Sequence, residues 1–387
     1  MPTRPWLRWL VPLAALFTVI ATVLVAGNAS ADEKLPPRSA EQLLVDLQQA
    51  QVDGFSGTVE QSADLGIPAL PGVSQHGSDF SSLISGSHTL RVAYAAPDSM
   101  RVSLLGDLSE SSIIKHGDDV WTWSSKDNAA THTTVDERGR RSDSSGPKDL
   151  PTDAPKTPQE AAQRILQVVD SSTEVSVATD TKVAGRAAYE LVLKPKDSRS
   201  LISSVRIAVD GAEHVATRVQ VYAGDQPDPV AEIGFSEVDF STPPASTFEF
   251  TPPKGAKVTE STTPDRSESG ESKKSDKNAG NDKSPQSEPT VVGEGWTSVV
   301  VAKLPDEKPP ATNDQGSDHR GQGDREQGQR GQGGAELQAY LNQLPKVSGS
   351  WGSGRLLAGK AFSLVITDDG RVAVGAVAPE LLYAALG

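Results

Sequence analysis

The chain has 387 residues, more than one ordinary domain needs, and its formal net charge is −14. An acidic chain is poorly suited to contacts with a nucleic-acid backbone, which need clustered Lys and Arg, so we expect no nucleic-acid partner. The absence of cysteine excludes disulfide bonds, a thiolate nucleophile, cysteine-bound zinc and lipidation at cysteine.

Residues 1–31 have the pattern of an export segment. Two arginines precede an apolar run of 17 residues, 10–26, and Ala29-Ser30-Ala31 then has the small-x-small pattern of a signal-peptidase site. We expect cleavage before Asp32. The alternative is an uncleaved N-terminal anchor, because this run is near the lower length limit of a spanning helix. Both predict an extracytoplasmic protein, either secreted or associated with the cell envelope.

A helix and a long meander of strands are predicted next. Ser39-Ala40-Glu41-Gln42 has the spacing of a capping box and predicts a short amphipathic helix over 39–51. Short alternating apolar runs separated by turns are typical of an antiparallel sheet. The expected strands are 55–61, 88–95, 100–105, 111–116, 120–125, 130–135, 175–183, 187–194, 201–209, 213–223 and 229–238.

A second helix interrupts this meander. Thr157-Pro158-Gln159-Glu160 has the spacing of a second capping box, with proline at the first helical position. The loop-like 62–86 segment is apolar enough that we expect it to fold over another part of the protein. The 248–255 segment should end the unit, because its two prolines cannot continue strand pairing. The apolar stripe expected on the second helix is Ala162, Ile165, Leu166 and Val169.

The 175–195 hairpin has the clearest alternation. Gly185 lies at its turn and suits a backbone with positive φ. Each strand of the hairpin is predicted to place one set of residues on one face. These are Val175, Val177, Thr179, Thr181 and Val183 on the first strand, and Ala187, Tyr189, Leu191 and Leu193 on the second.

The C-terminal third alternates between polar and apolar segments. Residues 259–290 and 305–334 lack the apolar side chains that would offset the entropy of ordering, so we expect disordered linkers there. One strand is expected over 291–304. Residues 335–387 predict a small module with too little core of its own, which should dock on the main sheet. Its expected elements are a helix over 335–344, a hairpin of 354–367 and 371–377, and a helix over 379–386.

The sequence contains no G-x-S-x-G, H-E-x-x-H or P-loop motif, and no G-x-G-x-x-G that follows a predicted strand. His88, His116 and His132 lie on predicted strands, but no carboxylate spacing supports a metal site there. Asp118-Asp119 and Asp368-Asp369-Gly370 are better explained as hairpin turns than as calcium ligands. We therefore predict a protein that is not an enzyme and that binds neither cofactor nor metal.

Several local motifs, taken together in their order, resemble the LolA family of lipoprotein carriers. The 183–191 segment is similar to the family's V-x-G-R-x-x-Y-x-L hairpin, and Pro97 to Arg101 is similar to its P-x-x-x-R turn. The 248–258 segment, FEFTPPKGAKV, is similar to the closing F-x-F-x-P-P-K-G-x-x-V. Val120-Trp121-Thr122-Trp123 fits the strand before the mid-sheet helix.

The resemblance covers about 37–260 and implies a mainly β, α+β domain over 32–258. This domain would be an incomplete antiparallel β-barrel of about eleven strands with helices on its concave face. It also implies a monomeric, non-enzymatic carrier that binds lipid or lipoprotein acyl chains, with a membrane protein as a further partner. The alternative is an envelope-stress regulator of the RseB/MucB type, in which a similar half-barrel restrains an anti-sigma factor.

A carrier needs an apolar cavity, because an acyl chain in water costs about 0.8 kcal/mol per CH₂. The alternative is that the helices and the 62–86 loop fill this space as a packed core. For the two tryptophans, a core position is the alternative to a ligand platform. The expected cavity residues are Leu90, Val92, Tyr94, Met100, Val102, Leu104, Trp121, Trp123, Tyr189, Leu191 and Leu193.

Overall fold

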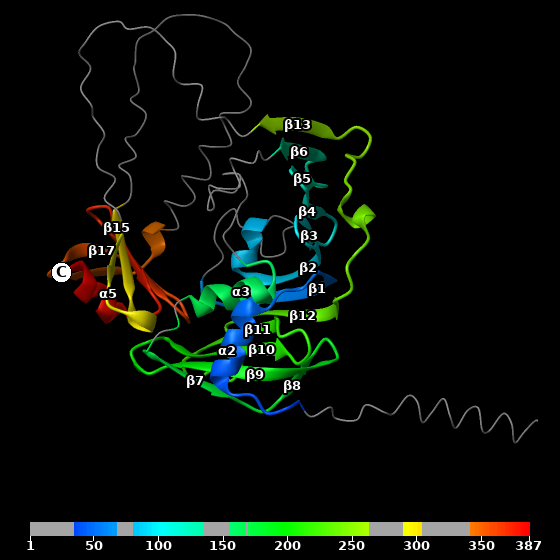
Figure 1. Ribbon diagram of the computed structural model, residues 1–387. Helices are drawn as coiled ribbons and strands as arrows, with labels where there is room; N and C mark the ends of the chain where they lie inside the picture. Colours follow the sequence, from blue (N-terminus) through cyan, green and yellow to red (C-terminus); the bar gives the residue numbers. More distant parts are fainter. Residues whose placement is uncertain are drawn as a thin grey trace, which may run out of the picture. The chain divides into compact units, whose positions relative to one another are not determined.

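The computed structural model contains two β-sheets, one of 13 strands and one of six (Figure 1). Both belong to one compact unit, Arg38–Gly387. Three expectations concern residues that the structure does not describe. They are those for residues 1–31, for most of both linkers and for the start of the 335–344 helix. No helix among the described residues is long and apolar enough to cross a membrane. The structure describes residues 35–67, 80–134, 155–167, 169, 171–262, 289–303 and 341–387.

The large sheet is antiparallel except at one edge, where β13 runs parallel to β6. The strand order is β13-β6-β5-β4-β3-β2-β1-β12-β11-β10-β9-β7, with β8 also paired to β9. Because the edge strands β13 and β7 do not meet, the sheet is open, as expected of an incomplete barrel. Its strands are β1 Gly54–Ala63, β2 Gly86–Ala95, β3 Ser99–Leu105, β4 Glu110–His116, β5 Asp119–Ser124, β6 Ala129–Thr134, β7 Thr173–Val177, β8 Thr181–Val183, β9 Arg186–Pro195, β10 Ile202–Asp210, β11 Ala216–Ala223, β12 Ala231–Asp239 and β13 Lys257–Thr262.

The strand expected over 175–183 is broken into β7 and β8. Six positions separate Val177 from Val183, but only five separate their β9 partners, Leu191 and Arg186. The extra residue acts as a bulge and reverses the alternation. Val183 therefore packs with Ala188 on the face opposite to Val177, and the single-face prediction for 175–183 is wrong.

Strand pairing continues beyond the two prolines, contrary to the prediction for 248–255. Residues 251–256 pass the prolines without a strand, and β13 then pairs in register with β6, from Lys257 opposite Ala129 to Thr262 opposite Thr134. Residues 259–262, expected to begin a disordered linker, are part of this strand.

Two helices and one 3₁₀ turn cover one face of the large sheet (Figure 1). They are α2 Ala40–Gln49, α3 Pro158–Leu166 and η2 Phe80–Ile84. Ser39 and Gln42 form the predicted capping box on α2, with reciprocal side-chain to backbone bonds of 3.3 and 3.0 Å.

The N-terminus of α3 differs from the predicted capping box. Thr157 Oγ1 accepts a hydrogen bond from the Glu160 N–H at 3.1 Å, as expected of an N-cap residue. The Glu160 carboxylate accepts instead from the N–H of Lys156 at 3.0 Å, one residue earlier than a capping box requires. The helix start is thus predicted correctly, but its second capping bond is not.

The second sheet has the order β14-β15-β19-β18-β17-β16 and a core of its own. Helix α5 Pro379–Leu386 packs on one face and buries Val299, Val365, Ala373 and Leu382. The expectation that this part has little core is wrong, because β14 and β15 join it from before the second linker. The strand expected over 354–367 is divided by a turn at Gly359. The strands are β14 Thr290–Val292, β15 Val299–Lys303, β16 Lys346–Gly349, β17 Gly352–Ala358, β18 Ser363–Thr367 and β19 Arg371–Gly375.

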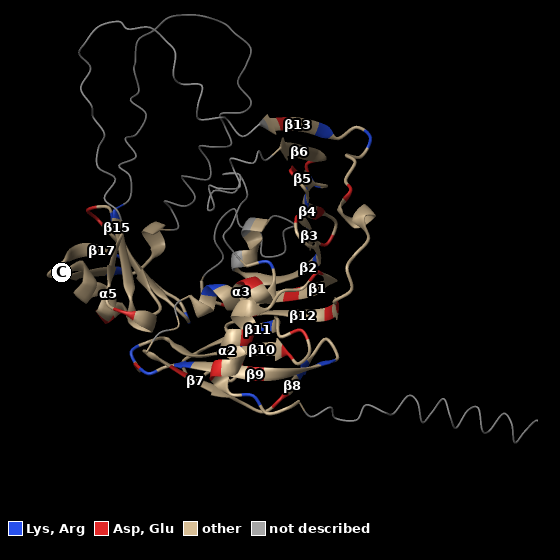
Figure 2. Ribbon diagram, viewed as in Figure 1, with Lys and Arg blue, Asp and Glu red and all other residues tan. Residues whose placement is uncertain are grey.

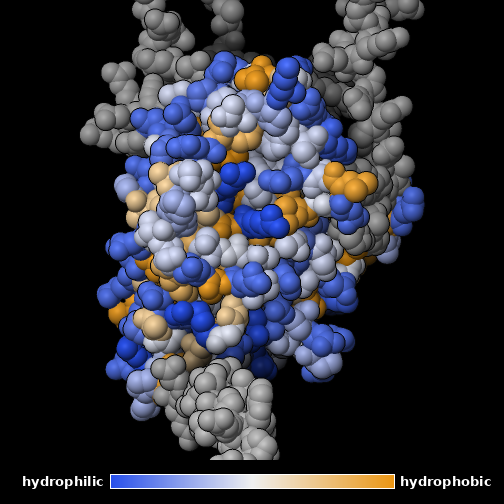
Figure 3. All heavy atoms as spheres, turned by 90° about the vertical axis from the view of Figure 1, so that its right-hand side faces the viewer, coloured by the Kyte–Doolittle hydropathy of each residue, from blue (hydrophilic) through white to orange (hydrophobic). Residues whose placement is uncertain are grey.

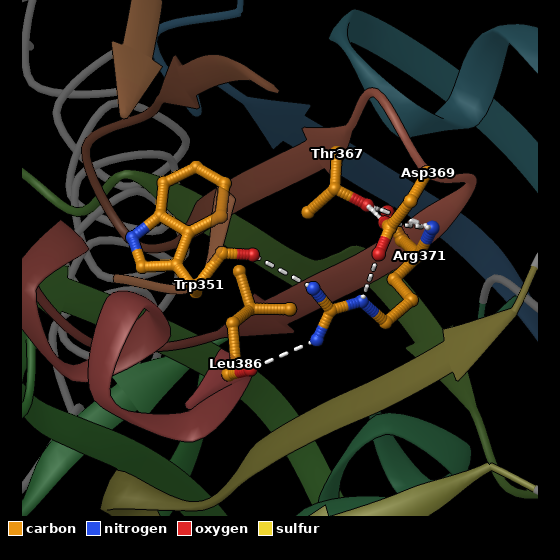
Figure 4. A network of polar contacts seen from close by, with 5 residues as sticks. All are labelled: Trp351, Thr367, Asp369, Arg371 and Leu386. Atoms are coloured by element: carbon orange, nitrogen blue, oxygen red, sulfur yellow. Dashed lines mark hydrogen bonds and ion pairs between the residues drawn. The ribbon is translucent and has the colours of Figure 1, made fainter. Parts of the chain in front are cut away.

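Arg371 connects three parts of the second sheet (Figure 4). Its guanidinium donates hydrogen bonds to the carbonyl oxygens of Trp351 and Leu386, both at 2.8 Å, and its Nε donates to Asp369 at 2.9 Å. The arginine therefore holds the last residues of α5 against the turn before β17.

Only a few polar contacts are seen between the two sheets. The Leu201 N–H donates to the Ala376 carbonyl at 2.8 Å, and Trp296 Nε1 donates to Thr173 Oγ1 at 2.8 Å. Lys360 also donates its backbone N–H to Leu65 at 2.7 Å. The Lys360 ammonium also pairs with the Asp64 carboxylate, and Ser200 and Val377 form an isolated antiparallel bridge. Among the described residues, the C-terminal part meets the large sheet through these contacts and the three bonds above.

Candidate ligand-binding face

The strand register assigns each expected cavity residue to one of two faces, because directly opposite residues in neighbouring strands share a face. Leu90 lies opposite Leu104 on β3 and opposite Val59 on β1. On the other half of the sheet, Leu191 lies opposite Ile207. We call the side under α2, α3 and η2 the covered face and the opposite side the outer face. Nine of the eleven expected residues lie on the covered face: Leu90, Val92, Tyr94, Met100, Val102, Leu104, Tyr189, Leu191 and Leu193.

The covered face is apolar across most of the sheet. Strands β1, β12, β11 and β10 connect its two halves without a gap. In this structure protein atoms bury these side chains, so an apolar ligand has to displace α2, α3 or η2 to reach them. Its most buried members include Val59, Leu90, Val102, Leu104, Tyr189, Leu191, Leu193, Val205, Ile207, Val209 and Val219, each at most 2% exposed.

Trp121 and Trp123 lie on the outer face, away from the other nine residues. Val102 pairs with Ile113 and Ile113 with Thr122, so Thr122 is the covered-face residue of that strand. Both tryptophan rings instead contact Phe250, with centroid distances of 5.4 and 6.0 Å. Their assignment to the cavity therefore requires correction: they pack under the segment that leads to β13.

Gln159 joins both covering helices to the sheet. Its side-chain NH₂ donates to the Leu47 carbonyl at the end of α2 at 3.2 Å, and its Oε1 accepts from the Ala216 N–H on β11 at 2.7 Å. Leu43 and Leu47 of α2 are fully buried. A single amide thus connects α2, α3 and β11.

Two polar side chains attach η2 to the covered face. Gln61 Nε2 donates to the Leu83 carbonyl at 2.6 Å, and His88 Nε2 bonds to the Ser85 carbonyl at 2.9 Å. Gln61 and His88 are directly opposite each other on β1 and β2. The sequence analysis missed this pair, although each interrupts an apolar alternation, Gln61 after Val59 and His88 before Leu90.

The outer face is polar where no chain segment crosses it. Glu190 on β9 lies within ion-pair distance of Arg206 and Arg218, at 3.6 and 3.7 Å. Acidic and basic residues are interspersed along the described elements (Figure 2). On the side seen in Figure 3, hydrophobic residues form small patches separated by hydrophilic ones. The broad apolar surface of the large sheet is therefore the covered face.

The three histidines on predicted strands do not converge. His88 lies on the covered face, whereas His116 and His132 lie on the outer face. No group of three or more His, Asp or Glu among the described residues is arranged to hold a metal ion. His132 instead lies between two carboxylates, Asp119 and Glu260.

No protein-family model matches this chain, and no curated protein matches it. Solved structures that resemble it include the MucA/MucB complex of Pseudomonas aeruginosa, with 11% identity, a TM-score of 0.41 and coverage of 90% of this chain and 96% of that chain. A LolA superfamily protein from Nitrosomonas europaea has 11% identity and a TM-score of 0.21, over 55% of this chain and 99% of that chain. An outer membrane lipoprotein-sorting protein domain from Vibrio parahaemolyticus has 14% identity and a TM-score of 0.22, over 54% and 97%. The family that the motifs resemble therefore recurs among these structures, but likeness at this level supports no statement about activity, ligand or partner.

Proposed function

We propose that this protein is an exported, non-enzymatic carrier that encloses a lipid or lipoprotein acyl chain between the covered face and its helices. The observation that carries the proposal is the covered face itself. It is apolar over most of its strands, and it is closed by separate short elements rather than by a second sheet.

Among the described residues, three side chains that bond the cover to the sheet can be named. Gln159 is the side chain that links α2 and α3 to β11, and Gln61 and His88 attach η2. The cover also makes apolar contacts with the sheet, which an acyl chain replaces at about 0.8 kcal/mol per buried CH₂. Exchange of cover for ligand therefore leaves the apolar face buried in both states.

A second candidate function is an envelope-stress regulator that binds a membrane anti-sigma factor, as the RseB/MucB resemblance implies. The second sheet favours this candidate, because a carrier that only encloses an acyl chain has no evident use for a further core with its own helix. Under this proposal, binding of an acyl chain changes how the protein interacts with its membrane partner, and the partner passes on the signal.

The test is to extract lipids from the full-length protein purified from its envelope and to titrate it with a fluorescent acyl probe. We expect co-purified lipid and saturable probe binding. Tyr94→Glu, on the half-buried end of the covered face, should weaken binding about tenfold or more, because the carboxylate loses hydration against the chain. Trp123→Glu is the matched control, a half-buried aromatic on the outer face.

Absence of both co-purified lipid and probe binding would overturn the carrier. Equal losses in the two variants, with both folded by circular dichroism, would place binding elsewhere. A pull-down on the same material separates the two candidates: lipoproteins are expected with a carrier and a membrane anti-sigma factor with a regulator.

A further inference from the structure

The covered face contains a buried acceptor without a partner. Gln61 Oε1 is, among the described residues, a buried side-chain atom that makes no hydrogen bond. Its amide NH₂ is already used by the Leu83 carbonyl of η2. Because buried polar atoms are normally paired, such an exception requires a physical explanation.

His88 lies next to Gln61 on the adjacent strand. His88 is 5% exposed, and its Nε2 faces the Ser85 carbonyl, which can only accept. Nε2 therefore carries the hydrogen, and in the neutral ring Nδ1 is left with a lone pair. Since His88 is directly opposite Gln61 in the register, the imidazole and the glutamine side chain occupy neighbouring positions on the covered face.

The surroundings of this pair are apolar in two directions. Along β1 the covered-face residues run from Gln61 through Val59 to Phe55, a distance of roughly 20 Å. Across the strands, Gln61 lies opposite Ile233, and the same row continues through Val219 and then through Ile207 and Leu191. Either direction offers an extended apolar path that begins at a polar position.

We propose that Gln61 and His88 bind the head of an amphiphile that donates a hydrogen bond, an amide N–H or a hydroxyl, next to an apolar chain. This inference rests on the carrier function proposed above and names the ligand class at that site. When η2 moves aside, the donor satisfies Gln61 Oε1, and the chain takes the place of the covering residues. A methyl ester of the same chain offers only acceptors and leaves the glutamine oxygen unpaired.

The experiment compares binding of three ligands of one chain length: a fatty N-alkyl amide, a fatty alcohol and a fatty-acid methyl ester. The wild-type protein should bind the amide or the alcohol about three- to tenfold more tightly than the ester, the range that one net hydrogen bond provides. Comparison of the amide with the alcohol then distinguishes an N-acyl source from a hydroxyl lipid.

Two variants test the residue. Gln61→Met keeps the shape but removes the acceptor, so ester binding should persist while the preference disappears. Gln61→Glu keeps acceptor oxygens and should retain the preference, and it decides the question if the methionine variant fails to fold. Equal wild-type affinity for all three ligands would overturn this inference and leave the carrier intact. Failure of every ligand to bind would instead overturn the carrier function, and this inference with it.

Discussion

His132 holds the edge strand β13 through a carboxylate at each ring nitrogen. Nε2 lies 2.9 Å from Asp119 and Nδ1 lies 2.8 Å from Glu260, which is on β13. Since a carboxylate can only accept, both bonds require the protonated ring. Burial by itself lowers the pKa of His132, but the hydrogen bonds and charges of Asp119 and Glu260 outweigh it, so the pKa is raised.

Attachment of β13 should therefore weaken as the pH rises. Because the pKa of His132 is raised in the folded state, its proton stabilises the folded protein. This stabilisation is complete below the ordinary histidine pKa of about 6.5 and is lost as the pH rises through the raised pKa. Amide exchange in β13 should therefore accelerate beyond its intrinsic increase as the pH rises above about 6.5. His132→Gln should remove this excess. His116→Gln, on β4 two strands away from β6 and with a bond to Ser99, should retain it, and an equal effect of both variants would contradict the assignment.

Asp210, which pairs with Arg186, is the most buried carboxylate among the ion pairs that the structure describes. The Asp210 side chain is 1% exposed and accepts two bonds from the guanidinium, at 2.5 and 2.9 Å. The N–H groups of Ala212 and Glu213 also donate to it. The arginine of the V-x-G-R motif thus fixes the loop that joins β10 to β11.

Arg186→Met should destabilise the large sheet by about 3–5 kcal/mol, because it leaves a buried carboxylate without its cation. Urea unfolding measures this loss. The control is Arg206→Met, whose side chain is 44% exposed and lies 3.6 Å from Glu190; its cost should stay within about 1 kcal/mol. Similar costs for the two variants would show that burial of Asp210 does not determine the effect.

At the scale of helices and strands, periodicity predicted where most elements lie but could not assign every face. Alternation within a strand says which residues share a side, whereas the register with the next strand says which side that is. Trp121 and Trp123 were grouped with Leu90 because all are large and apolar, yet the pairing of Ile113 with Thr122 turns them outward. The bulge before Val183 has the same effect, because no local residue pattern announces the extra position.

The polar members of the candidate site were missed for a related reason. The roles of Gln61 and His88 follow from their register and from the carbonyl groups that they contact. These belong to Leu83 in η2 and to Ser85 just after it, 22 and 3 residues away in sequence. Strand β13 was missed because most of its residues are polar and even its Val258 is exposed, so its pairing depends on backbone bonds and on Glu260 rather than on apolar burial.

Gln159 provides the prediction for the covering helices. Gln159→Ala leaves the Ala216 N–H, in a fully buried residue, without its acceptor and should destabilise the protein by about 1–3 kcal/mol. Hydrogen exchange in α2 and α3 should increase, and acyl-probe uptake should become faster. The control is Gln163→Ala, an exposed residue of the same helix. Unchanged exchange in α2 would show that the Leu47 bond does not join the helices.

At the scale of the whole molecule, the two sheets have separate cores. Leu191 and Ile207 are buried within the large sheet, whereas Val365 and Leu382 belong to the cluster under α5. The described polar contacts between the sheets are few. Trp296 makes its contact through its side chain, and Lys360 donates to Leu65 from the backbone of a loop. Each sheet should therefore respond to its own substitutions.

Arg371→Met tests this independence. The variant removes the charge-assisted hydrogen bonds to the carbonyl oxygens of Trp351 and Leu386. Each lost bond should destabilise the second sheet by at most about 1.5–3 kcal/mol. We expect calorimetry of the full chain to resolve two transitions, of which only one moves to lower temperature. Hydrogen exchange assigns that transition: β17–β19 should lose protection while β9–β11 keep theirs. Lys346→Met, an exposed position on β16, is the control and should move neither transition. A single transition that shifts as a whole would show instead that the few bonds through Ala376, Thr173 and Leu65 couple the sheets into one cooperative unit.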